Sequence, residues 1–143
     1  MTDRGLDAYI RFYETMSPDS LSELDRLVTP DVIFRDPFNE VQGPEAMRRI
    51  FTHVFDTVAG PRFYVTHRAF DGAVCFLRWR FTGIVAAMGK RPWTVEGVSE
   101  IHFGEDGKIR AHIDHWDAAG QFYARLPVVG PIFRLIRRRA RAR

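Results

Sequence analysis

The hydrophobic pattern of this chain changes its period at Gly60-Pro61, and this change limits the possible folds more than any other feature of the sequence. Before this point apolar residues recur every three or four positions, as they do on one face of a helix. After it they alternate with polar residues in long stretches, as they do in strands with one buried face. Helices followed by a strand meander are typical of an α+β domain, in which a sheet packs on helices.

Three helices are expected in the first part of the chain. The first ends near Ser17-Pro18, Asp19 or Ser20 caps the second, and Gly43-Pro44-Glu45 opens the third, which stops at Gly60-Pro61. A turn at residues 29–31 leads into a short strand over 32–38, between the second and third helices.

Four longer strands are expected over about residues 62–70, 73–85, 93–103 and 109–117. Asp71-Gly72 and Glu105-Asp106-Gly107 predict hairpin turns between them. Asp117 is placed to cap a last short helix that runs to about Leu126. The sequence therefore predicts one domain over residues 1–127, a cone-shaped half-barrel whose curved antiparallel sheet wraps around three N-terminal helices, followed by a tail over 128–143.

Two aspartates stand on strand faces that are otherwise apolar or aromatic. Asp36 continues the face of Val32 and Phe34, and Asp114 lies between His112 and Trp116 on a polar-aromatic stripe. A buried carboxylate has to be paired, hydrogen-bonded or chemically employed, because burying an unpaired charge is very unfavourable. We expect both carboxylates to converge in one apolar pocket.

Four short motifs resemble, in order and spacing, those of the nuclear-transport-factor-2-like superfamily, also described as SnoaL-like or ketosteroid-isomerase-like. The resemblance covers roughly residues 5–126, and the motifs are residues 32–38, 43–47, 107–109 and 115–117. It implies the cone fold, a pocket for a small hydrophobic molecule, and chemistry without a metal or an organic cofactor. It leaves the reaction open, because this fold hosts isomerases, cyclases, dehydratases, epoxide hydrolases and noncatalytic binders.

The resemblance also implies roles for single residues. Asp36, just before Pro37, matches the proton-shuttling aspartate of ketosteroid isomerases, whereas Asp114 with His112 is similar to the acid-base group of SnoaL-like polyketide cyclases. Either carboxylate would transfer a proton at an activated carbon or carbonyl oxygen. The asp-arg-asp relay of limonene epoxide hydrolases is incomplete, because the strand before Asp114 offers Gly97-Val98-Ser99 in its place. The residues expected to contact substrate are Tyr13, Ser99, Trp116, Phe34 and Trp79.

Each candidate has a structural alternative. Asp36 can cap a turn, His112 can be structural, and Asp114 can pair with an arginine; the arginines within reach are Arg78, Arg80 and Arg110. The leading hypothesis is a small-molecule-binding protein with isomerase-type or cyclase-type acid/base activity on a steroid-like or polyketide-like carbonyl compound. The alternative is a noncatalytic ligand-binding or interaction module. In either case the outer sheet face is expected to form a homodimer.

The net charge of +3 comes from the tail: residues 134–143 hold six arginines and no acid, which leaves 15 basic and 18 acidic residues elsewhere. With the apolar residues from Val128 onward, the tail reads as a basic amphipathic helix, suited to peripheral membrane contact or to a lipid handler. The arginines expected to make that contact are Arg134, Arg137, Arg138 and Arg139. The alternative is an apolar segment that covers the pocket mouth. An acidic body argues against nucleic-acid binding.

The remaining composition points to a cytoplasmic setting. Cys75 is the single cysteine, which excludes an internal disulfide, and the N-terminus lacks an apolar signal core. No apolar run approaches the ~20 residues that span a bilayer. The histidines other than His112 lack metal-ligand spacing, so no metal site is expected.

Overall fold

A computed structural model describes residues 2–142 of the protein, with side chains from residue 4 onward. The N-terminal elements are α1 (Thr2–Glu14), the 3-10 helix η1 (Asp19–Glu23), α2 (Leu24–Leu27), β1 (Val28–Arg35), β2 (Glu40–Gln42) and α3 (Pro44–Thr57). The elements that follow are β3 (Val58–Asp71), β4 (Val74–Val85), η2 (Ala86–Met88), β5 (Pro92–Phe103), β6 (Ile109–Trp116), α4 (Ala118–Gln121), η3 (Tyr123–Arg125) and α5 (Gly130–Ala140).

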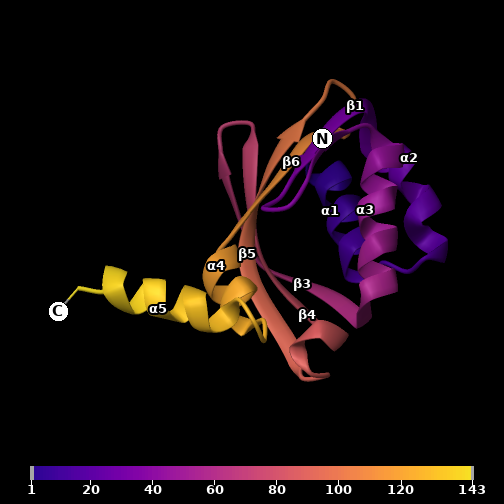
Figure 1. The fold of residues 1–143 in the computed structure, drawn as a ribbon. Helices are drawn as coiled ribbons and strands as arrows, with labels where there is room; N and C mark the ends of the chain where they lie inside the picture. Colours follow the sequence, from indigo (N-terminus) through magenta and orange to yellow (C-terminus); the bar gives the residue numbers. More distant parts are fainter. Residues whose placement is uncertain (1, 143) are drawn as a thin grey trace.

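The strands form one sheet in the order β2-β1-β6-β5-β4-β3. β1 runs parallel to β6, and the other neighbours are antiparallel. The sheet curves around α1 and α3, which cover its inner face, while α5 extends away on the other side (Figure 1). The predicted α+β half-barrel is therefore confirmed.

The core lies between the helices and the inner faces of β1, β4, β5 and β6. Its fully buried residues come from α1, α2, α3 and the sheet; they include Leu6, Tyr9, Leu24, Val32, Met47, Cys75, Ile101 and Ile109. A second, smaller cluster of buried residues surrounds Trp79, Phe81 and Trp93. The predicted alternation in β4, β5 and β6 thus gives the observed inner faces.

The region between α1 and α3 differs from the prediction. Neither Asp19 nor Ser20 caps a helix: the N-cap position of η1 is Pro18, already in a helical conformation, and it makes no side-chain cap bond. The predicted turn at residues 29–31 is part of β1, and its pairing with β6 shifts register between Val28 and Ile33. Such an interruption accommodates Pro30, which has no N–H to donate to a ladder.

Other boundaries also moved. α3 ends at Thr57, before the predicted end at Gly60-Pro61, and Val58 already begins β3. The short β2 was not predicted. Both hairpin turns are present, with Gly72 and Gly107 at positive φ, and Asp117 caps α4 by accepting a hydrogen bond from the Gly120 amide at 2.9 Å.

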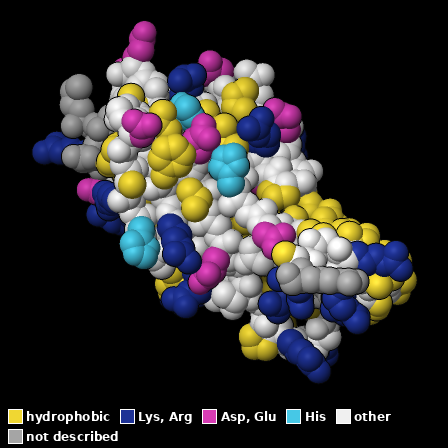
Figure 2. All heavy atoms as spheres, turned by 90° about the vertical axis from the view of Figure 1, so that its left-hand side faces the viewer, with side chains coloured by type: hydrophobic (Ala, Val, Ile, Leu, Met, Phe, Trp, Pro, Cys, Tyr) yellow, Lys and Arg dark blue, Asp and Glu magenta, His cyan; other side chains and the backbone are white. Residues whose placement is uncertain are grey.

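The outer face of the sheet mixes charged, histidine and hydrophobic side chains (Figure 2). Its partly exposed apolar residues are Ile33, Tyr64, Phe70, Phe76 and Ile84. The homodimer predicted for this face remains a prediction. Within residues 2–142 no helix combines the length and the apolar character needed to cross a membrane.

Candidate functional site

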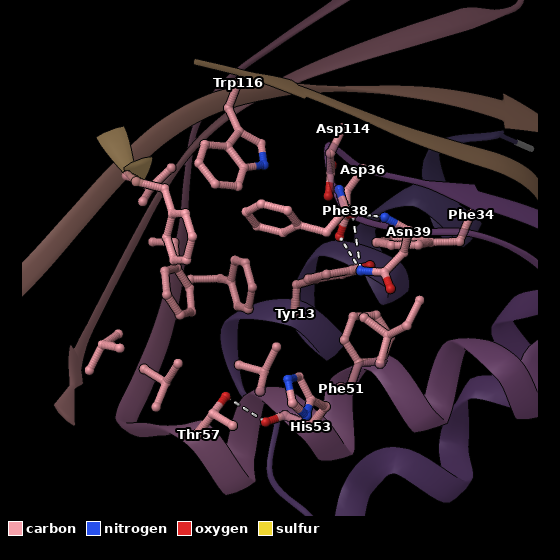
Figure 3. Close-up of a pocket in the computed structure, with 18 of the residues that line it drawn as sticks. Tyr13, Phe34, Asp36, Phe38, Asn39, Phe51, His53, Thr57, Asp114 and Trp116 are labelled. Atoms are coloured by element: carbon pink, nitrogen blue, oxygen red, sulfur yellow. Dashed lines mark hydrogen bonds between the residues drawn. The ribbon is translucent and has the colours of Figure 1, made fainter. Parts of the chain in front are cut away.

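A cavity with a volume of about 760 Å³ lies between α3 and the inner face of the sheet. This volume is that of a typical small-molecule site. Much of the wall is aromatic; the rings come from Tyr13, Phe34, Phe38, Phe51, Phe63, Trp79, Phe81, Trp93, Trp116, Phe122 and Tyr123. Polar groups are few and gather at opposite ends, Asp36 and Asp114 at one, His53 and Thr57 of α3 at the other (Figure 3).

Gly97 makes room for two of these rings. It pairs with Trp79 on β4 and with Trp116 on β6, so the three residues lie side by side across the sheet. A Cβ at position 97 would lie 2.6 Å from the ring of Trp79 and 2.9 Å from the Cβ of Trp116, closer than side-chain atoms normally approach. The glycine is therefore required for both indoles to border the pocket.

Asp114 brings a charge to this apolar wall. Its side chain lies on the inner face of β6 and is 17% exposed. Its Oδ1 atom accepts hydrogen bonds from the Ser99 hydroxyl at 2.5 Å and from His112 Nε2 at 2.7 Å. Its Oδ2 atom has no hydrogen-bond partner in the described part of the chain, and the residue borders the cavity. One carboxylate oxygen is thus held in place while the other is available to a ligand.

A buried chain of hydrogen bonds stands behind Asp114. Trp79 Nε1 donates to Ser99 Oγ at 2.8 Å, and because the indole only donates, the serine proton is left for Asp114. On the other side, the Tyr9 hydroxyl lies 2.7 Å from His112 Nδ1. In the tautomer that directs Nε2–H at the carboxylate, Nδ1 is the acceptor for the Tyr9 hydroxyl. The network fixes the orientation of the carboxylate and of the imidazole.

Tyr13 links this network to the cavity. Its hydroxyl lies 3.3 Å from His112 Nδ1 and 3.4 Å from the Tyr9 hydroxyl, both long contacts, and its ring borders the cavity. Burial raises the pKa of Tyr9 and of Tyr13 well above the ordinary value, and the charge of Asp114 adds to the effect. Both phenols therefore stay protonated at neutral pH and act as neutral hydrogen-bond donors.

Asp36 reaches the same end of the cavity but is bonded within a turn. Its Oδ1 accepts from the backbone amides of Phe38 at 2.8 Å and Asn39 at 2.7 Å, and the Asn39 side-chain amide contacts both carboxylate oxygens. This is the bonding of the turn-capping alternative. Asp114 is the carboxylate that keeps an oxygen without a partner.

The remaining predicted site residues fall into two groups. Tyr13, Phe34, Trp79 and Trp116 border the large cavity, as expected for substrate contacts. Ser99 and His112 lie behind Asp114 instead, beside a void of about 30 Å³. No arginine pairs with Asp114 among residues 2–142, and Arg78 pairs with Glu96 at 3.4 Å.

Sequence reasoning did not include Tyr9 among the site residues. Its signal was the four-residue spacing from Tyr13, which places two hydroxyl-bearing rings on one buried helix face. Arg49, His53 and Thr57 were also missed at the cavity wall, because they stand beside the apolar stripe of α3 rather than on it. In the described part of the chain, no group of His, Cys, Asp and Glu side chains is arranged to hold a metal ion.

Comparisons with known proteins agree with this geometry. Residues 9–112 match the sequence model of the SnoaL-like domain. No curated protein sequence is significantly similar to the chain.

Solved structures share the fold at low identity. A protein with a ketosteroid isomerase-like fold from Catenulispora acidiphila, in complex with trimethylamine, is 14% identical with a TM-score of 0.72, covering 89% of this chain and 96% of that one. An NTF2-like protein of unknown function from Exiguobacterium sp. 255-15 is 20% identical with a TM-score of 0.68, covering 79% and 98%. An epoxide hydrolase from M. tuberculosis, described as LEH-like, is 14% identical with a TM-score of 0.65, covering 95% and 96%.

Proposed function

The chain belongs to the SnoaL-like domain family, and from that premise we propose that it binds a small hydrophobic carbonyl compound and catalyses a proton transfer on it without a cofactor. Asp114 is the proton-transferring group in this proposal. The aromatic wall suits a flat, polycyclic ligand of steroid-like or polyketide-like shape, because stacked and edge-to-face ring contacts favour planar partners. The similarity in fold to an epoxide hydrolase is compatible with an enzyme but identifies no reaction.

The unequal bonding of the two Asp114 oxygens is the observation that carries the proposal. Oδ1 is held by Ser99 and His112, which orients the group, whereas Oδ2 has no partner among the described residues. A general base needs both a fixed position and a free lone pair directed at the proton it removes. Asp114 meets both requirements, and its neighbours are themselves hydrogen-bonded.

The proposed step balances without an added reagent. A C–H bond beside the substrate carbonyl breaks, its proton forms an O–H bond on Asp114 Oδ2, and the electron pair moves to the carbonyl oxygen. Tyr13, neutral and bordering the cavity, is the donor available to that oxygen. In a substrate with a β,γ double bond, return of the proton from Asp114 to the γ-carbon completes an isomerisation. In a substrate with a second carbonyl, the enolate carbon attacks that carbonyl carbon, and the alkoxide so formed takes the proton back from Asp114, which gives a cyclisation.

The three tryptophans of the chain provide a binding assay, since Trp79, Trp93 and Trp116 all border the cavity. Hydrophobic carbonyl compounds would be screened by quenching of tryptophan fluorescence. Each compound that binds would then be incubated with the protein in D₂O. Mass spectrometry would measure the uptake of deuterium at the carbon next to its carbonyl group. Catalysed uptake is the expected result.

Asp114→Asn is expected to lower the exchange rate by roughly 10²–10⁴-fold, the usual contribution of a general base, while the dissociation constant changes little. Asp36→Asn tests the rival base, and Asp71→Asn, at an exposed hairpin turn, is the matched control. Exchange that survives Asp114→Asn but is lost in Asp36→Asn would transfer the role to Asp36.

A noncatalytic binding module is the second candidate. It is favoured by the hydrogen bonds of both carboxylates, since Asp36 is bonded within a turn and Asp114 is held by Ser99 and His112. Ligands that quench the tryptophans but take up no deuterium above the uncatalysed rate would support this second candidate and contradict the first.

A further inference from the structure

The C-terminal helix α5 is attached to the body only at its start. Gly130 packs against the backbone of Ala124, Phe133 stacks on Tyr123 with ring centroids 5.1 Å apart, and Arg134 donates to the Ala124 carbonyl at 2.6 Å. After Arg134, no residue of the described chain forms a hydrogen bond, ion pair or ring contact with the body. The helix therefore projects from the sheet, away from α1 and α3 (Figure 1).

The projecting helix carries an uncovered apolar stripe. Ile132, Leu135 and Ile136, spaced three and four residues apart, are 57%, 48% and 57% exposed, and Val128 just before the helix is 82% exposed. The stripe does not cover the cavity, none of whose wall residues belongs to α5. The pocket-covering alternative for the tail is therefore wrong.

Positive charge surrounds the stripe. Arg134, Arg137, Arg138 and Arg139 lie on α5, Arg141 follows it, and no acidic residue occurs after Asp117. Figure 2 shows hydrophobic and arginine side chains next to each other at this end of the molecule. Residues 1–117, in contrast, hold 14 basic and 18 acidic side chains. The chain is thus polarised, with a mildly negative body and a strongly positive helix.

From this arrangement we propose that α5 docks the protein on the surface of an anionic lipid bilayer, with the stripe inserted between headgroups and the arginines on lipid phosphates. Apolar area and basic charge on one helix act together at such a surface. Duplex nucleic acid would contact the arginines but leave the stripe in water. Pairing of α5 with a second copy would bury the stripe but bring arginines against arginines, without acidic partners.

One short helix binds reversibly, so docking is expected to be weak and sensitive to salt. Anionic headgroups repel the negatively charged body of the protein. This repulsion favours one orientation, in which α5 faces the bilayer and the body faces water. The proposal concerns only where the protein sits, and it stands independently of the chemistry at Asp114.

The test is cosedimentation of the full chain with vesicles of phosphatidylcholine alone or mixed with phosphatidylglycerol. Binding is expected only to the mixed vesicles, and high salt should release it. Arg137→Gln/Arg138→Gln should weaken partitioning by about 30-fold, since each arginine near such a surface is worth about 1 kcal/mol. Arg11→Gln/Arg91→Gln removes the same charge from exposed body positions and should have no such effect.

The apolar part is tested by Leu135→Gln/Ile136→Gln, with Ile33→Gln/Ile84→Gln on the outer sheet face as its control. The helix variant alone should release the protein from mixed vesicles, and because these side chains are exposed, unfolding should be unchanged. Three outcomes would overturn the proposal: no sedimentation with mixed vesicles, equal loss in both arginine variants, or self-association abolished by Leu135→Gln/Ile136→Gln without vesicle binding. Displacement from vesicles by duplex DNA at low concentration would favour nucleic acid instead.

Discussion

Tyr9→Phe tests whether the buried hydrogen-bond chain behind Asp114 stabilises the protein. The substitution removes one hydroxyl and keeps the ring, which is fully buried in the core. The hydroxyl forms the shortest hydrogen bond to His112 Nδ1, at 2.7 Å, and the His112 side chain is only 4% exposed. The variant therefore leaves a buried acceptor without its main donor.

The expected cost follows from that geometry. A buried polar group that loses its partner costs about 1–3 kcal/mol of unfolding free energy. Tyr13, at 3.3 Å from the same nitrogen, can move in and recover part of the loss. We therefore expect Tyr9→Phe to cost about 1–2 kcal/mol, Tyr13→Phe less, and the double variant more than the sum of the two.

The pH dependence gives a second, independent value. Because burial raises the pKa of Tyr9 above its ordinary value of 10.0, the unfolded chain loses this proton first as pH rises. The folded state then binds more protons than the unfolded state, so stability falls as pH rises above 10. The stability advantage of the wild type over Tyr9→Phe should shrink by about 1.4 kcal/mol between pH 9 and pH 11.

Urea unfolding followed by far-ultraviolet circular dichroism measures both quantities. Tyr64→Phe is the matched control, because Tyr64 is 39% exposed on the outer face and its hydroxyl forms no hydrogen bond within the described chain. Its change should stay within about 0.5 kcal/mol at neutral pH. A Tyr9→Phe cost as small as that of Tyr64→Phe, with an unchanged slope above pH 10, would refute the reasoning.

Three further changes have defined outcomes. Gly97→Ala should lower the free energy of unfolding by about 1–3 kcal/mol, because the new Cβ crowds Trp79 and Trp116, and it should weaken the binding of any ligand that quenches tryptophan fluorescence. Gly72→Ala is the control: it strains a hairpin turn and should destabilise the protein without affecting the binding of that ligand. Asp117→Ala should cost about 1 kcal/mol in a thermal or urea melt through loss of the α4 cap. The hydrogen bond from His102 lowers the pKa of Glu100, so Glu100→Gln should flatten the loss of stability as pH falls below 4.5, which acid titration of urea unfolding would detect. An equally steep acid limb in that variant would contradict the last of these.

The sequence predicted the fold because its two hydrophobic periods are local. Residues such as Leu77 and Trp79 alternate with arginines, so the inner face of β4 is readable without knowing its neighbours. The same alternation placed His112 and Asp114 on the inner face of β6. Boundaries failed where context decides them: Pro18 already has helical backbone angles, and Pro30 lies in a strand whose ladder is interrupted there.

The site was harder to predict, because it depends on contacts between distant segments. The alternation of residues along the strand predicts which face of the sheet Ser99 lies on. Only the three-dimensional packing shows that its hydroxyl accepts a hydrogen bond from Trp79 and donates one to Asp114. Tyr9 and His112, 103 positions apart, meet only after the sheet closes on α1. For Asp36, strand parity placed the side chain at the cavity, where it lies, but the pattern did not show that the strand ends at Arg35 and that the following turn uses the carboxylate.

The stack of Tyr123 on Phe133 joins two regions that are otherwise separate. Tyr123 borders the cavity, and Phe133 belongs to α5. A tilt of α5 would therefore move the ring of Tyr123 in the cavity wall. In return, a bulky ligand that displaces this ring would tilt α5. We therefore expect membrane docking of α5 and entry of a ligand into the cavity to be coupled through the contact between Tyr123 and Phe133.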